Sequence, residues 1–193
     1  VVNGASKADA AASASNGEDT EYVQTPISPE HLAGLVANGR NVILSGEGGI
    51  GKTTTVLQLA KTLLDEHATE RVPIFVDAPA WASSNMSPFQ YIASLPVFEA
   101  AEMTATKLAK YAAQNKLTLF IDGWNEIAFS SMEACSNRMR SFFTAAPGVN
   151  IVLTTRNENQ RPDFASPLQV IVTGIDWHNQ QNYIRAELPT SEA

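Results

Sequence analysis

The sequence predicts an α/β fold in which helices cover both faces of a mainly parallel, five-stranded sheet. Short apolar runs alternate with helical patterns along the chain, which is typical of parallel strands joined by helical crossovers. The chain has 193 residues, 44% of them apolar, which is enough for one sizeable core and too few for two domains of ordinary size. We therefore expect one three-layer α/β/α domain.

Five apolar runs are predicted to be the strands, at residues 41–45, 72–77, 117–122, 150–155 and 168–172. The proline in the second run is acceptable because it lies near the start of that strand. Pro79 is predicted to end this region in a loop that contains Trp81. Each of the other runs ends in glycines or polar residues, as expected where a strand leaves the sheet.

Helical spacing marks the segments between the strands. Apolar residues recur at that spacing after the first strand and again before the fourth: Val56, Leu59, Ala60, Leu63, Met132, Cys135, Met139 and Phe142. A further helical stretch is predicted over about residues 87–114, and Asp176 is suited to cap a last helix. That last helix would carry Trp177, Ile184 and Leu188 on one side. Cys135 is predicted to fill the core rather than to act as a nucleophile.

Composition excludes several classes of function. Lys and Arg number 13 against 20 Asp and Glu, and the net charge of −7 argues against a broad surface for nucleic acid or anionic membranes. A single cysteine excludes an internal disulfide framework and favours a reducing, cytoplasmic setting. Neither a membrane span nor a signal peptide is predicted. The three histidines lie far apart, without metal-ligand spacing.

Residues 1–22 are predicted to be a flexible tail or linker, because small and polar residues dominate them and offer little apolar surface to bury. The folded domain is then expected to span residues 23–193.

A glycine-rich loop carries the strongest functional signal. The segment 46–53 matches the pattern G-x-x-x-x-G-K-[ST] between an apolar strand and an amphipathic helix. Glycines allow consecutive backbone N–H groups to approach one anion, Lys52 adds a charge for the β- and γ-phosphates, and Thr53 presents its hydroxyl to Mg²⁺. The predicted nucleotide contacts in this loop are Gly46, Glu47, Gly48, Gly49, Ile50, Gly51, Lys52, Thr53 and Thr54.

An acidic cluster follows the third strand. Asp122 ends that strand at the carboxyl edge of the sheet, where a carboxylate can hold Mg²⁺ through its water shell. Glu126 is the candidate for the base that orients or deprotonates the attacking water. Asn125 could hydrogen-bond that water or the γ-phosphate.

An arginine follows the fourth strand. Arg156 is placed where its guanidinium could contact the γ-phosphate and distinguish a triphosphate from a diphosphate. Arg161 is a weaker candidate for the same role.

Taken in this order, the loop, the segment 121–127 and Thr155-Arg156 resemble NACHT-type domains of the STAND class of P-loop NTPases, over about residues 38–188. The segment Ile121-Asp122-Gly123-Trp124-Asn125-Glu126-Ile127 is similar to a hydrophobic strand that ends in Asp-Gly-apolar-Asp/Asn-Glu. Trp124 stands where Leu or Phe is commoner in the family, and Asn125 stands where Asp is commoner.

The resemblance implies a P-loop NTPase fold that binds ATP and ADP with Mg²⁺, turns ATP over slowly and acts as a regulatory switch. It also implies neighbours that this chain lacks: a preceding effector domain, then helical, winged-helix and sensor domains. The chain is therefore expected to be the central part of a larger protein, with nucleotide-dependent self-assembly possible. Adenine contacts are expected around residues 23–27 and from the last helix.

Other nucleotide enzymes fit less well. Asn115-Lys116-Leu117-Thr118 has threonine where a guanine-binding motif requires aspartate, and no Leu-Ser-Gly-Gly-Gln transporter signature follows the loop. Arg156 and Arg161 would make only a thin lid for a small-molecule kinase. The main alternative is an interaction module that binds ATP with negligible hydrolysis, because binding requires Lys52, Thr53 and Asp122 but not Glu126.

Overall fold

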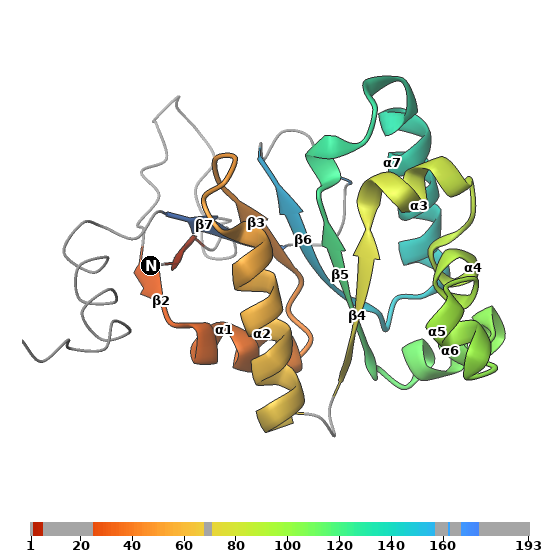
Figure 1. Cartoon of the computed structure of the whole chain (residues 1–193). Coiled ribbons are helices and arrows are strands. Elements are labelled where there is room, and N and C mark those ends of the chain that lie inside the picture. The colour runs from red at the N-terminus through yellow and green to blue at the C-terminus, as the bar shows by residue number, and fades with distance from the viewer. Residues whose placement is uncertain (1, 6–24, 68–70, 157–161, 163–166, 174–193) are drawn as a thin grey trace, which may run out of the picture.

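The computed structural model describes residues 2–5, 25–67, 71–156, 162 and 167–173, and its strands form one sheet. Seven strands lie in the order β2-β1-β7-β3-β6-β5-β4 (Figure 1). Their bounds are β1 Val2–Ala5, β2 Thr25–Ile27, β3 Val42–Ser45, β4 Val72–Asp77, β5 Leu117–Asp122, β6 Asn150–Thr155 and β7 Leu168–Val172. The five from β3 to β7 pair in parallel, which confirms the predicted sheet.

Helices cover both faces of this sheet. Side chains alternate between the two faces along each strand, so the strands present apolar residues on both faces, and each face packs against helices. α1 (Pro29–Ala37) and α2 (Lys52–His67) pack on the face that carries Val42, Leu44 and Phe120. The opposite side holds α3 (Ala78–Ser84), α4 (Pro88–Ala93), α5 (Pro96–Ala100), α6 (Ala105–Ala113), the 3₁₀ helix η1 (Trp124–Glu126) and α7 (Phe129–Ala145) (Figure 1). The predicted three-layer architecture is thus confirmed. No helix in the described part of the chain is long and apolar enough to cross a membrane.

The segment after β4 differs from the expected loop. Trp81 lies in α3, and the Asp77 side chain starts this helix by accepting a hydrogen bond from the Ala80 backbone N–H at 2.7 Å. Pro79 falls in the first turn, where its missing N–H has no intrahelical partner to lose and its fixed φ favours the helix. Pro79, which is predicted to end the strand region in a loop, instead helps to begin α3.

The predicted helical stretch over residues 87–114 is three helices rather than one. Pro96 interrupts the first part, because a proline cannot donate to the preceding turn, and α5 begins there. Glu102 has a left-handed backbone with φ of 51°, which ends the second part. The Thr104 side chain then accepts from the Lys107 backbone N–H at 3.2 Å and starts α6.

The first residues contribute to the sheet. Within the segment expected to be a tail, residues 2–5 form β1, which pairs antiparallel with both β7 and β2. Strand pairing uses backbone amides, so a segment with few large apolar side chains can still extend a sheet. The remainder of that expected tail, and the last helix expected from Asp176, lie outside the described residues.

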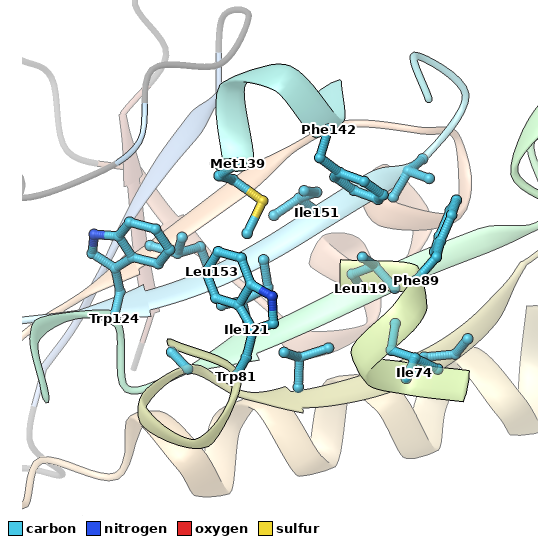
Figure 2. Packing of buried hydrophobic residues seen from close by; sticks show 14 of the residues in the cluster. Ile74, Trp81, Phe89, Leu119, Ile121, Trp124, Met139, Phe142, Ile151 and Leu153 are labelled. Atoms are coloured by element: carbon cyan, nitrogen blue, oxygen red, sulfur yellow. The ribbon is translucent and has the colours of Figure 1, made fainter. Parts of the chain in front are cut away.

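An aromatic core anchors the end of β5. The Trp81 and Trp124 side chains lie next to each other (Figure 2), and their rings stack with centroids 6.2 Å apart. The Arg138 guanidinium carbon lies 4.7 Å from the centroid of the Trp81 ring. Trp81 Nε1 donates to the Met86 carbonyl at 2.9 Å. Because Trp124 belongs to η1, directly after β5, this packing fixes the chain as it leaves the sheet.

Replacing Leu119 by Ala should lower the free energy of unfolding by about 2–5 kcal/mol, because Leu119 on β5 is fully buried and truncation leaves a cavity (Figure 2). Urea denaturation followed by circular dichroism measures the loss. Leu64→Ala on α2 is the matched control, since that side chain is 51% exposed and should cost less than about 1 kcal/mol. Equal losses in the two variants would contradict the core described here.

Candidate functional site

The glycine-rich loop joins β3 to α2 and has a backbone that only glycine adopts readily. Gly51 has φ of 101°, in the left-handed region. At Gly46 a Cβ atom would lie 2.7 Å from the Val172 carbonyl oxygen on β7, so a side chain there would push the loop away from the sheet. The loop is therefore held close to the strand ends, directly before the N-terminus of α2.

Lys52 is the first residue of α2, and its ammonium group lies inside the loop. Nζ donates to the carbonyls of Gly46 at 2.8 Å and Glu47 at 2.7 Å. Burial lowers the pKa of Lys52 below its ordinary value of 10.5, and the positive charge of Arg156 lowers it further. The acidic groups of Asp122 and Glu126 offset only part of this shift. An anion bound beside Lys52 would stabilise the charged form and raise this pKa.

Thr53 and Asp122 meet although they are far apart in the sequence. The Thr53 hydroxyl donates to Asp122 Oδ2 at 2.9 Å, which joins the start of α2 to the end of β5. Hydroxyl and carboxylate oxygens are ligands that Mg²⁺ accepts, and Mg²⁺ usually takes few protein ligands and keeps waters and phosphate oxygens. The donor pair therefore fits this ion. The described residues contain no group of three His, Cys, Asp or Glu suited to hold a metal by protein ligands alone.

Arg156 directly follows β6, and its side chain reaches the glycine-rich loop. Its Cζ atom is 3.3 Å from the position that a Cβ would take on Gly48, so the guanidinium rests against the loop. The Arg156 backbone N–H donates to Asn125 Oδ1 at 2.9 Å. Asn125 thus holds the start of the segment after β6, a role that its expected contact with water or phosphate does not include.

A cavity of about 290 Å³ brings these groups together. Its lining contains most of the predicted site: Gly48, Gly49, Gly51, Lys52, Thr53, Thr54, Asp122, Asn125, Glu126 and Arg156. Three predicted contacts do not line it. Gly46 approaches β7 instead, Glu47 supplies a carbonyl to Lys52, and Ile50 packs against the apolar residues beneath α1 and α2.

Two further expectations concern the adenine contacts and a second arginine. β2 covers part of the segment 23–27 that was expected near adenine, but it does not line this cavity. Arg161 lies outside the described residues.

Sequence reasoning missed Thr154 and Gly123, which also line the cavity. Thr154 lies on β6 and is 1% exposed, and its hydroxyl bonds to Asp122 Oδ1 and to the Gly123 backbone N–H. The available signal was a polar residue at the carboxyl end of the apolar run Ile151-Val152-Leu153. Threonine is common in strands, so the residue type alone does not separate this role from ordinary packing.

A larger cavity of about 930 Å³ lies between α6 and α7, away from these residues. Small apolar and aromatic side chains form much of its wall, including Ala109, Ala113, Phe89 and Phe142. It contains none of the phosphate-loop residues. The smaller, polar cavity has the chemistry to bind a polyanion, and size alone is a poor guide here.

Comparison with solved structures supports the same architecture. Domain III of the Thermotoga maritima replication initiation protein DnaA is 17% identical, with 83% of this chain and 70% of that one covered and a TM-score of 0.54. AMPPCP-bound DnaA from Aquifex aeolicus is 15% identical, with 86% and 51% covered and a TM-score of 0.54. The Aeropyrum pernix ORC1 protein in complex with DNA is 16% identical, with 82% and 47% covered and a TM-score of 0.52.

At these identities the similarity shows the fold alone, and this chain spans about half the length of the Aquifex and Aeropyrum proteins. No curated protein sequence matches the chain. The family model for the NACHT domain matches residues 40–191, which include the loop, the acidic cluster and Arg156. The chain therefore belongs to the NACHT domain family, the nucleotide-binding P-loop NTPases of the STAND class.

Proposed function

We propose that this domain binds ATP with Mg²⁺ in the cavity between the glycine-rich loop and the ends of β5 and β6, and that it acts as a regulatory switch with slow ATP hydrolysis. One observation carries the proposal: Lys52, the Thr53–Asp122 pair and Arg156 all line the same small polar cavity. A cation, a pair of oxygens suited to Mg²⁺ and a second cation are the groups that a nucleoside triphosphate requires.

The phosphate chain accounts for the positive charges. Loop N–H groups and Lys52 are suited to the β- and γ-phosphates, and the positive end of the α2 dipole adds to their effect. Arg156 approaches the loop from β6 and is placed for the terminal phosphate. The choice of adenine rests on the family and on the AMPPCP bound to the Aquifex aeolicus DnaA.

Thr53 and Asp122 would hold Mg²⁺ with the phosphates, and the ion would neutralise charge on the β- and γ-oxygens. In the described state the two side chains bond to each other. Entry of the ion would replace that bond by contacts to the metal or its waters. The fold therefore positions the two ligands of the ion, because it brings Thr53 at the start of α2 next to Asp122 at the end of β5.

Hydrolysis would depend on Glu126. Its exposed carboxylate belongs to η1 and lines the cavity, where it can orient a water for attack on the γ-phosphate. Because this carboxylate is exposed, it would hold the attacking water loosely, and we therefore expect slow turnover. A domain that binds ATP with negligible hydrolysis is the competing proposal, because the binding groups do not include Glu126.

Switching would pass through Arg156 and Asn125. A γ-phosphate that attracts the Arg156 guanidinium acts on the end of β6, and the 2.9 Å bond to Asn125 links this point to η1. We propose that neighbouring helical, winged-helix, sensor and effector domains, or a second copy of the domain, respond to this change. The net charge of −7 gives no support for carrying over DNA binding from the ORC1 complex.

Lys52→Ala should weaken ATP binding by about 10- to 100-fold, because it removes a charge-assisted contact to the phosphates. Titration with a fluorescent ATP analogue measures the effect. Lys61→Ala is the matched control on the same helix, since Lys61 is exposed and pairs only with Asp65 among the described interactions. Equal affinity in wild type and Lys52→Ala would reject the phosphate site.

Glu126→Gln should bind ATP as the wild type does and hydrolyse it about 100-fold more slowly in a single turnover, because the amide cannot accept the proton of the attacking water. Glu133→Gln, an exposed acid on α7, serves as the control. An unchanged rate would place the base elsewhere. If the wild type itself shows no turnover, the binding-module proposal replaces the ATPase.

Arg156→Ala should lower the affinity for ATP by about tenfold and leave that for ADP nearly unchanged, because only the triphosphate reaches the guanidinium. Parallel titrations with the two nucleotides measure the ratio, with Arg140→Ala on α7 as the control. A loss of equal size for ATP and ADP would show that Arg156 does not distinguish the terminal phosphate.

A further inference from the structure

We infer that Thr154 is a positioning residue that orients Asp122 for Mg²⁺, so that its hydroxyl sets how strongly ATP binding depends on the ion. The inference rests on the proposed function and assigns a specific part of it to β6. Thr154 was not among the predicted site residues, and it lies on β6, the strand that precedes Arg156.

Strand register places the two side chains together. Ile121 on β5 pairs with Leu153 on β6, so the next residues, Asp122 and Thr154, lie side by side. Leu119 and Ile121 face the core beneath α7, which turns Asp122 toward the opposite face, where α2 begins. Thr154 follows the same alternation on β6, and the hydroxyl therefore reaches the carboxylate beside the phosphate loop.

The direction of the hydrogen bonds follows from chemistry. The Gly123 backbone N–H lies 2.8 Å from Thr154 Oγ1 and can only donate, so the threonine oxygen accepts there. Its one proton is then left for Asp122 Oδ1, which can only accept when ionised. The hydroxyl thus serves both the carboxylate and the backbone of the next residue.

This arrangement divides the work of the two Asp122 oxygens. Oδ1 is held by Thr154, whereas Oδ2 lies 2.9 Å from the Thr53 hydroxyl, at the proposed ion position. Rotation of the Asp122 carboxylate would break the bond between Oδ1 and the Thr154 hydroxyl. The hydroxyl would then still accept from the Gly123 N–H, but its own proton would have lost its acceptor. Groups that orient a metal-binding carboxylate in this way typically change metal affinity by about 10- to 100-fold when removed.

A second buried threonine separates this role from ordinary packing. Thr118 on β5 is fully buried, and its Oγ1 has no hydrogen-bond partner among the residues that the structure describes. Removal of that hydroxyl should leave Asp122 unaffected. Valine matches threonine in shape and keeps the β-branched side chain that suits a strand, so the same substitution at the two positions differs in the hydrogen bonds lost.

The test titrates Mg²⁺ into the protein with a fluorescent ATP analogue and repeats the nucleotide titration in EDTA. Thr154→Val should raise the Mg²⁺ concentration for half-maximal binding about tenfold, with affinity in EDTA unchanged. Thr154→Ser, which restores the hydroxyl, should return that concentration to within about threefold of the wild type. Thr118→Val should match the wild type, and thermal unfolding of each variant reports whether it is folded.

Several outcomes overturn the inference. An unchanged Mg²⁺ requirement in folded Thr154→Val does so, as does an equal loss of affinity with and without Mg²⁺, which would indicate general damage to the site. If Thr154→Val does not fold, Thr154→Ala, which also removes the hydroxyl, decides: a Mg²⁺ requirement raised about tenfold supports the role, and an unchanged requirement rejects it. A wild type that binds no ATP at any Mg²⁺ concentration rejects the proposed function itself, and this inference with it.

Discussion

Parallel pairing of β3, β6 and β5 is the constraint on which the site depends. Parallel strands end at the same edge of a sheet. This edge therefore brings together three segments that are far apart in the sequence: the loop after β3, Asp122 at the end of β5 and Arg156 after β6. The central position of these strands gives the edge rigidity, since their side chains are buried on both faces. Function can then reside in a few polar groups at that edge.

The balance of charge at this edge explains what can bind there. Lys52 and Arg156 lie close enough for the arginine to lower the pKa of the lysine, an arrangement that costs free energy until an anion separates the two charges. Asp122 and Glu126 would oppose a bare polyanion, and a divalent cation held by Thr53 and Asp122 would reduce that repulsion. A nucleotide together with its metal therefore suits the site better than either alone.

The predictable features of the chain were those encoded in periodicity and in short motifs. The five parallel strands and the loop at residues 46–53 could be located because buried strands are continuous apolar runs and a phosphate loop requires glycines at set spacing. Trp81 and residues 87–114 were predicted less well, because Pro79 and Pro96 each lie in the first turn of a helix, α3 and α5. A proline suits a loop as well as a first helical turn, so the residue type alone does not distinguish the two. β1 escaped prediction because backbone pairing leaves no apolar pattern.

Thr154 and Asn125 show why the finer parts of a site are harder to predict. Thr154 bonds from β6 to the end of β5, and Asn125 on η1 bonds to the Arg156 backbone. Bonds of this kind depend on strand register and tertiary packing, which no local pattern reports. The two residues joined by the Asn125–Arg156 bond are held to different degrees. Trp124 fixes η1 through its stack on Trp81, so Asn125 is a firm support. The Arg156 side chain is exposed, and within the described part of the chain its guanidinium rests against Gly48 while its backbone N–H bonds to Asn125. A change in the bound phosphates would therefore be expressed first in the Arg156 side chain, because the side of the site formed by η1 is held by the packing of Trp124 on Trp81.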